Sequence, residues 1–289
     1  MHGINKLIPS EYFILFSVFF FFNLVSVSSQ QKDNPESEIY LIVRGDDMGF
    51  CHATNVACIR SFRKGIIRSV EVMVPAPWFL DAAEMLKENP GLDVGVHLTL
   101  TSEWKNYKWR PVTGAPGLQD ADGYFFPTVQ ALQQAIPDPD IVEKELRAQI
   151  KMAMKHIPNL THLSDHMGAS SCRPEYKEIV NKLSREYNLP VILENAHEEI
   201  GFWDTPADKK EAFLYKTINN LMPGLWIIYC HPGLDTPETQ GIISASQHPS
   251  DVFMAEYRAA VTKAVTSDRI KTLINQKGIH LVSYGTMIK

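Results

Sequence analysis

Short apolar runs alternate with longer segments of helical periodicity from Ile39 to the end of the chain. Apolar runs bounded by Gly, Pro or Asp are typical of strands, whereas apolar residues three or four positions apart are typical of helices. The pattern predicts strands over residues 39–44, 67–74, 92–98, 160–165, 190–193, 225–230 and 279–284. It predicts helices over residues 52–64, 78–88, 139–155, 174–187, 208–219, 249–265 and 267–276.

Strand and helix therefore alternate about seven times, which indicates an α/β fold with a parallel sheet. The sheet could be open and doubly wound, or closed as a (β/α) barrel. The turn from Gly45 to Gly49 lacks the glycine spacing of phosphate-binding loops. This argues against nucleotide binding and favours the barrel.

Regular periodicity fails between residues 99 and 136, a stretch rich in Gly, Pro, Trp and Tyr. Irregular segments of this length are usually lids or binding loops. Four tryptophans in or beside loops could stack on a ligand or pack in the core or at its rim; they are Trp78, Trp104, Trp109 and Trp203.

The first 29 residues have the pattern of a secretory signal peptide. Lys6 precedes an apolar run over residues 12–25, and small residues follow up to Ser29. The run is shorter than the roughly 20 residues of a membrane span, although an uncleaved anchor is the alternative. We expect an exported protein, periplasmic or secreted, with no stable membrane anchor after cleavage. Residues 30–37 would be a flexible leader, and residues 38–289 a single catalytic domain.

The amino-acid composition limits the kinds of molecule that the protein could bind. The 289 residues carry a net charge of −5, so there is no basic surface of the kind that binds nucleic acid. The four cysteines match no zinc-binding spacing and read as buried thiols, with one disulfide left open; they are Cys51, Cys58, Cys172 and Cys230. Homo-oligomerisation is also left open.

Candidate catalytic side chains follow four of the predicted strands. Asp46 and Asp47 end the first, and His97, His166 and His231 end three later ones. Taken singly, the acid pair could be a solvated turn and each histidine a core residue. In a parallel barrel, however, these strand ends meet at one rim. Two imidazoles and a carboxylate can hold a divalent metal, and a further carboxylate and imidazole can move protons.

With these motifs the chain resembles the YdjC/ChbG-type carbohydrate deacetylases, of which chitooligosaccharide deacetylase is the named example. The matching motifs are Asp-Asp-Met-Gly at 46–49, Gly-Val-His-Leu-Thr-Leu-Thr at 95–101, Thr-His-Leu-Ser-Asp-His-Met-Gly at 161–168 and His-Pro-Gly at 231–233. They occur in the family's order within residues 38–284. The resemblance implies a distorted TIM-like (β/α) barrel that removes acetyl groups from N-acetylated sugars or oligosaccharides.

The resemblance also implies a role for each candidate residue. Asp47, His97 and His166 would bind one divalent metal ion, Asp46 would be the base that activates water, and His231 would protonate the leaving amine or stabilise the tetrahedral intermediate. Family resemblance suggests Mg²⁺, whereas two imidazole ligands favour Zn²⁺ or another transition metal.

One motif departs from the family pattern, which often reads His-x-Asp-Ser-His-His-x-x-His. Here residues 162–170 read His-Leu-Ser-Asp-His-Met-Gly-Ala-Ser, so the aspartate is displaced and the later histidines are missing. The surroundings of the metal, and hence the substrate preference, could differ. The alternative functions are a metal-dependent amidase or esterase on another acylated molecule, and a sugar-binding relative without turnover.

Overall fold

A seven-stranded parallel sheet forms the centre of the protein over the residues described by the computed structural model, which are 38–191, 196–245 and 248–288. The strands are β1 (Ile39–Met48), β2 (Ser69–Val72), β3 (Asp93–Leu98), β4 (Leu160–Asp165), β5 (Ala196–Gly201), β6 (Gly224–Cys230) and β7 (His280–Val282). Their order is β4-β3-β2-β1-β6-β5, and β7 also pairs with β1. All of these pairings are parallel, as the alternating sequence pattern predicts.

β1 is the central strand of the sheet. One edge pairs with β6 from Ile39 to Gly45, and the other pairs first with β7 and then with β2. Within the described ranges no ladder joins β4 to β5, but Leu163 N donates a hydrogen bond of 3.0 Å to Pro190 O beside that gap. The predicted distorted (β/α) barrel is confirmed.

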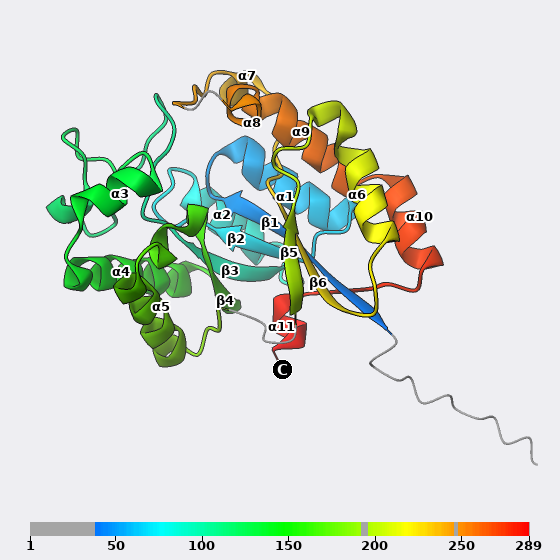
Figure 1. The fold of residues 1–289 in the computed structure, drawn as a ribbon, viewed down its shortest axis with the longest axis horizontal. Coiled ribbons are helices and arrows are strands. Elements are labelled where there is room, and N and C mark those ends of the chain that lie inside the picture. The colour runs from blue at the N-terminus through cyan, green and yellow to red at the C-terminus, as the bar shows by residue number, and fades with distance from the viewer. Residues whose placement is uncertain (1–37, 192–195, 246–247, 289) are drawn as a thin grey trace, which may run out of the picture. The chain divides into compact units, whose positions relative to one another are not determined.

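Helices cover the outside of the sheet (Figure 1). The α-helices are α1 (His52–Lys64), α2 (Phe79–Lys87), α3 (Val129–Ala135), α4 (Pro139–His156), α5 (Pro174–Tyr187), α6 (Lys210–Asn219), α7 (Pro237–Gln240), α8 (Pro249–Val252), α9 (Met254–Val265), α10 (Asp268–Gln276) and α11 (Tyr284–Met287). The 3₁₀ turns of the described residues are η2 (Pro116–Leu118), η3 (His166–Ser171) and η4 (Ala207–Lys209). None of the helices in the described ranges is long and apolar enough to cross a membrane.

The two faces of the strands differ in chemistry. On β1, Leu41 and Val43 belong to the large core beneath the helices, whereas Ile42 packs with Ile227 and Tyr284 in a separate small cluster. Because side chains alternate along a strand, Arg44 and Asp46 continue the face of Ile42. The interior of the sheet is thus apolar near the start of β1 and polar towards its end, where the pocket lies.

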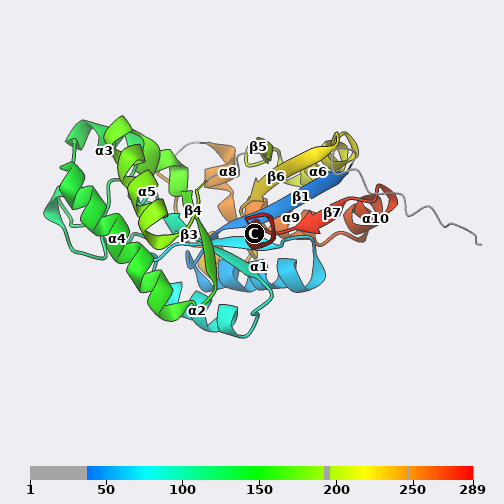
Figure 2. The same ribbon diagram turned by 90° about the horizontal axis from the view of Figure 1, so that it is seen from below.

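The short C-terminal helix α11 completes this interior (Figure 2). The Tyr284 ring stacks on His162 at 4.0 Å, and Tyr284 N donates a hydrogen bond to Ser69 Oγ. Ser69 and His162 lie near the starts of β2 and β4. The last residues of the chain therefore pack against the opposite end of the barrel from the candidate catalytic side chains.

Several element predictions need correction. The strand predicted at 39–44 continues to Met48, and the strand predicted at 279–284 is only His280–Val282, with Tyr284 already in α11. Residues 192–195 of the strand predicted at 190–193 lie outside the described residues, Pro190 and Val191 are not strand, and β5 begins later, at Ala196. The helix predicted at 249–265 is interrupted at Phe253, whose backbone is not helical (φ −106°, ψ 37°). The strand predicted at 67–74 is shorter, because only Ser69–Val72 pairs with its neighbours.

The irregular segment at 99–136 contains little regular structure beyond η2 and α3. It is tied to the segment before α8. Trp104 and Ser244 form an antiparallel bridge, and the Asn106 side chain exchanges hydrogen bonds with Gly241 O and Ile243 N. The described residues belong to one compact unit. The predicted signal peptide (1–29) and leader (30–37) lie outside the described residues, so these boundaries stay predictions.

Candidate active site and metal centre

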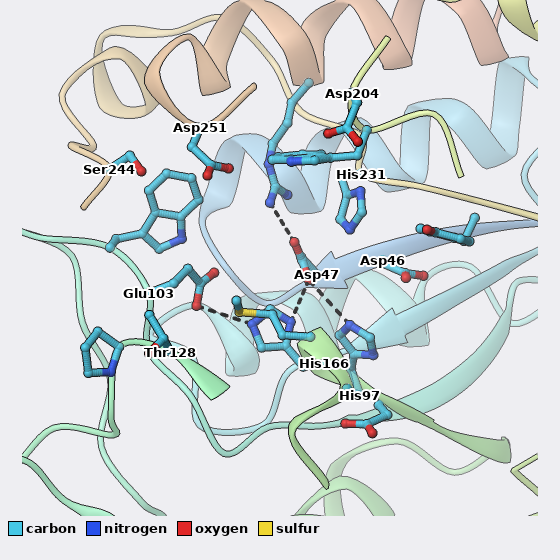
Figure 3. A pocket seen from close by; sticks show the side chains of 18 of the residues that line it. Asp46, Asp47, His97, Glu103, Thr128, His166, Asp204, His231, Ser244 and Asp251 are labelled. Carbon is cyan, nitrogen blue, oxygen red and sulfur yellow. Dashed lines mark hydrogen bonds and ion pairs between the residues drawn. The ribbon is translucent and has the colours of Figure 1, made fainter. Parts of the chain in front are cut away.

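One cavity of about 770 Å³ is lined by all five residues that the sequence pointed to (Figure 3). Asp46 and Asp47 lie near the end of β1 and His97 near the end of β3, while His166 directly follows β4 and His231 directly follows β6. The parallel sheet brings these strand ends to one rim. The cavity is in the size range of small-molecule sites.

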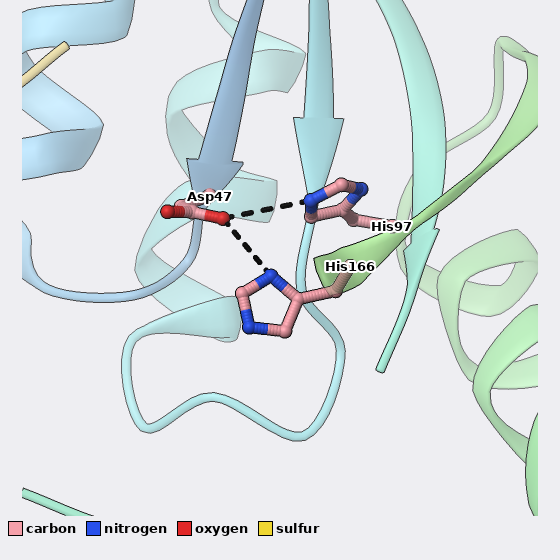
Figure 4. A group of neighbouring side chains, drawn as sticks. All are labelled: Asp47, His97 and His166. Atoms are coloured by element: carbon pink, nitrogen blue, oxygen red, sulfur yellow. Dashed lines mark ion pairs between the residues drawn. The ribbon is translucent and has the colours of Figure 1, made fainter. Parts of the chain in front are cut away.

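Asp47, His97 and His166 form a compact buried group (Figure 4). Asp47 Oδ1 lies 3.5 Å from His97 Nε2 and 3.3 Å from His166 Nδ1, and one ligand atom from each residue lies within 4.8 Å of the others. Ligands about 2.1 Å from an ion in a tetrahedral arrangement are roughly 3.4 Å apart. The spacing of this group could therefore hold a metal ion.

Asp47 Oδ1 provides a second test of that fit. This oxygen is buried and has no hydrogen-bond partner among the described residues. A buried acceptor without a partner costs free energy unless something else satisfies it. The unsatisfied oxygen lies between two imidazole nitrogens, which is the position of a metal ligand. The donor set therefore fits a divalent ion.

The backbone around Asp47 explains how two adjacent acids reach the same cavity. Neighbouring side chains on a regular strand point to opposite faces, which would separate Asp46 from Asp47. Instead, Asp47 adopts a left-handed conformation with φ 66°, and the register of β1 against β2 shifts between Gly45 and Met48. This bulge turns both carboxylates towards the cavity. Strained backbone of this kind is often found at functional sites.

Arg258 on α9 holds the other oxygen of Asp47. Its Nη2 donates a hydrogen bond of 2.6 Å to Asp47 Oδ2, and its guanidinium packs between the rings of Phe50 and Trp203. Although burial works to raise it, the Arg258 cation, helped by the neighbouring imidazoles of His166 and His97, holds the pKa of Asp47 well below its usual value. The carboxylate is therefore ionised and has Oδ1 free for an ion.

A chain of hydrogen bonds orients His97. Ser164 Oγ donates to Glu71 Oε2 and therefore accepts from His97 Nδ1–H, at 2.7 Å. With the proton on Nδ1, the Nε2 lone pair of His97 faces Asp47 Oδ1. A ligating imidazole is usually fixed in this way by a partner on its other nitrogen. Glu71 is fully buried and also bonds to His162 Nε2, so this acceptor is itself held in place.

Glu103 orients the second imidazole of the group, which belongs to His166. Its Oε2 lies 3.3 Å from His166 Nε2, while His166 Nδ1 faces Asp47. Burial lowers the pKa of His166, but the charge of Glu103 and the contact with Asp47 outweigh it and raise that pKa to about 10. In the metal-free protein, an ion that binds at Nδ1 therefore has to displace a proton.

Asp46 does not join the metal group but is clamped by Arg44. Arg44 Nε donates to Asp46 Oδ1 at 2.7 Å, and Nη2 donates to Oδ2 at 3.0 Å. Arg44 is itself held by Glu199 and Tyr284 through Nη1. A carboxylate has about four acceptor positions, so the two-pronged contact fixes Asp46 and still leaves lone pairs for another partner.

His231 lies at the opposite side of Asp47 from His166 (Figure 3). Its ring packs against Trp203 with the centroids 4.8 Å apart. Burial, assisted by the Arg258 cation and opposed by the Asp47 charge, lowers the pKa of His231 to about 4. The imidazole is therefore neutral near pH 7 and has one N–H to donate.

The altered motif at 162–170 has a structural explanation. Ser164 orients His97, and His162 is buried against Tyr284. Asp165 accepts hydrogen bonds from Ser170 N and Ser171 Oγ. It therefore caps the turn after β4, and no contact to a ligating imidazole is seen for it among the described residues.

Four residues of the site were missed in the sequence. Glu103 lies in an irregular segment and Arg258 is 211 positions from Asp47, so neither gives a local signal. Arg44 and Glu71 do give one: each is a charged residue within an apolar strand, and buried charges need partners.

The structure also shows where the tryptophans and cysteines singled out in the sequence lie. Trp104 and Trp203 line the cavity, Trp109 is buried, and Trp78 is partly exposed outside it. The four cysteines are free thiols, and three of them are buried.

Comparison with known proteins places the chain in a family. The profile of the family described as YdjC-like protein matches residues 40–276. A carbohydrate deacetylase of Thermus thermophilus is 32% identical over 237 residues, covering 74% of this chain and 84% of that protein. A carbohydrate deacetylase of Listeria welshimeri is 27% identical, covering 84% and 98%.

Two solved structures share the fold. A candidate cellobiose-phosphate cleavage protein of Enterococcus faecalis superposes with a TM-score of 0.70 at 22% identity, covering 87% of this chain and 99% of its own. A peptidoglycan N-acetylglucosamine deacetylase superposes with a TM-score of 0.50 at 12% identity, covering 88% and 89%. Because the family profile spans most of the residues from β1 to α10, the chain belongs to the YdjC-like family.

Proposed function

We propose that this protein is a metal-dependent hydrolase that removes acetyl groups from N-acetylated carbohydrates. The observation that carries the proposal is the buried Asp47–His97–His166 group with its unsatisfied Asp47 oxygen, in a cavity that Asp46 and His231 also line. The relatives named carbohydrate deacetylases support the substrate class.

In this proposal Asp47 Oδ1, His97 Nε2 and His166 Nδ1 hold one divalent ion. When bound, such an ion polarises the acetyl carbonyl and makes a water more acidic. Asp46, clamped by Arg44, takes a proton from the water that attacks the acetyl carbon. The carbon–nitrogen bond then breaks, acetate leaves, and the proton that Asp46 took from the water passes to the sugar nitrogen, which becomes an amine.

His231 stabilises the charge that develops on the carbonyl oxygen. With a pKa of about 4, its ring is neutral near pH 7 and donates a hydrogen bond rather than a proton at the outset. Of the two roles that the family resemblance implied, this favours stabilisation of the tetrahedral intermediate over direct protonation of the amine.

Acetate release from N-acetylated mono- and oligosaccharides tests the proposal. The protein is stripped of metal and reloaded separately with Mg²⁺, Zn²⁺ or Co²⁺. We expect acetate only with metal, and a loss of at least about 100-fold in kcat in Asp46→Asn with metal content unchanged. The most active ion identifies the cofactor.

Each contrary result would rule out a different part of the proposal. Unchanged metal content in Asp47→Asn or His97→Ala would contradict the ligand assignment. Metal binding without acetate from any sugar would favour another acylated substrate or a sugar-binding protein. Full turnover of Asp46→Asn would remove its role as a base.

A further inference from the structure

We propose that the cavity selects sugars with a protonated amino group beside the N-acetylated ring and rejects sugars with a phosphate or carboxylate. This inference rests on the proposed deacetylase function and specifies its substrate. It comes from the charges that line the cavity. Among the described lining residues there are seven carboxylates and two guanidinium groups, and no lysine.

Both guanidinium groups are already engaged. Arg44 is bonded to Asp46 and Glu199, and Arg258 is bonded to Asp47. Both arginine side chains are at least nine-tenths buried. Arg258 Nε and Nη1 have no hydrogen-bond partner among the described residues, but both atoms are buried. An anionic substituent on a sugar would therefore find no lysine and no exposed, unengaged guanidinium nitrogen among the described residues of the wall.

Among the described residues, no arginine or lysine pairs with the other four carboxylates of the wall. Glu103 and Asp165 contact a histidine and two serines, and Asp204 lies 3.4 Å from His248 Nε2. Figure 3 shows Glu103, Asp204 and Asp251 around one side of Asp47. One divalent ion would offset only part of this charge.

Acidic side chains alone do not define a binding site, but this cavity has a second feature. Asp47 Oδ1 is buried, unsatisfied and part of the same wall, so the cavity is built to receive a ligand. A sugar that carries both an amide and an ammonium group could place the amide at this centre and the ammonium near the outer acids. Deacetylation of a neighbouring ring produces such an ammonium group.

Binding to the metal-loaded protein tests this selectivity without turnover. The probes are three disaccharides that lack acetyl groups: cellobiose, the disaccharide of glucosamine with free amines, and cellobiose 6-phosphate. Calorimetry at about pH 6 keeps the amines protonated. We expect the amine to bind about 3- to 10-fold more tightly than cellobiose, and the phosphate to bind more weakly than cellobiose.

Variants identify the source of the preference. In Asp204→Asn/Asp251→Asn the three affinities should converge, as they should in high salt, because screening weakens exposed charges. Asp268→Asn, on α10 and outside the cavity, is the matched control and should keep the order. A phosphate that binds as tightly as cellobiose, or a preference for the amine that survives the double variant, would overturn the proposal.

Acetate assays separate this inference from the proposed function. A deacetylase that cleaves neutral and phosphorylated substrates equally well would overturn only the selectivity. The expected binding order without acetate from any sugar would overturn only the deacetylase assignment.

Discussion

The two ring nitrogens of His97 have different partners, and the Ser164 hydroxyl determines which of them carries the proton. This hydroxyl donates to Glu71 and accepts from Nδ1–H, which leaves Nε2 as a lone pair facing Asp47. An imidazole without such a partner distributes between two tautomers and rotates more freely. One small side chain therefore orients the His97 nitrogen that would ligate the proposed metal ion.

Replacing Ser164 tests this orientation. We expect Ser164→Ala to weaken metal binding by about 10- to 100-fold, because outer partners of ligating histidines typically have effects of this size. Titration of the metal-free protein with Zn²⁺ or Co²⁺ measures the dissociation constant. Ser164→Thr keeps the hydroxyl and should recover most of the affinity. Equal affinities in the wild type and Ser164→Ala would show that His97 is oriented without the serine.

The strands β2, β3 and β4 pack closely around two buried side chains, those of Glu71 and His162. Glu71 on β2 bonds to His162 on β4, and Gly95 on the intervening β3 leaves the space between them. A Cβ atom at Gly95 would lie 2.2 Å from Glu71 Oε2 and 2.5 Å from His162 Nε2. Glycine is required here by close approach and not by backbone conformation.

Gly95→Ala should therefore destabilise the protein by at least about 2 kcal/mol, because it overpacks the site and displaces a buried ion pair. Urea unfolding followed by circular dichroism gives the change in the free energy of unfolding. Gly91→Ala is the control, since its nearest neighbour would be a Phe62 atom at an ordinary 3.6 Å. If both variants were equally stable, the packing of these three strands would be looser than described.

Glu71 makes the stability of the whole protein depend on pH. Burial alone would raise its pKa, but the charges of His162 and Arg44 outweigh burial and lower it from 4.5 to about 2. Since the folded state has the lower pKa, the stabilisation is fully present above about pH 4.5. It is lost as the pH falls through about 2.

A comparison with Glu71→Gln isolates this contribution. The wild type should be more stable than the variant at pH 7, and the difference should narrow progressively below about pH 4.5. Urea midpoints measured from pH 7 to about pH 3 provide the test. A difference that stayed constant over this range would mean that another group carries the acid sensitivity.

The N-terminal residues predict where in the cell the protein is located. We propose export through residues 1–29, on the basis of the apolar run after Lys6 and the small residues up to Ser29. Expression of the full chain in a bacterium, followed by fractionation and intact-mass measurement, should give a mature form beginning near Gln30. A full-length mass in the membrane fraction would instead indicate an uncleaved anchor.

The sequence predicted most of the elements and pointed to the residues that meet in the Asp47–His97–His166 group, because both depend on local signals. The 3.6-residue and two-residue periods record which faces are buried, and Asp46, His97, His166 and His231 each interrupt or end an apolar strand. Parallel topology then requires those ends to meet. The late strand β5, which begins at Ala196, was misplaced because a short segment with two glutamates lacks a strand pattern.

The contacts that hold each side chain in place come from distant parts of the chain. Arg258 reaches Asp47 from a distant helix, Glu103 reaches His166 from an irregular segment, and Glu71 reaches His97 through Ser164. Hydrogen bonds between residues far apart in the chain leave no periodic trace. Periodicity and strand-end residues were therefore enough to predict the barrel and the residue types of its centre. The free oxygen of Asp47, the histidine tautomers and the acidic wall arise only when separate strands and helices come within bonding distance.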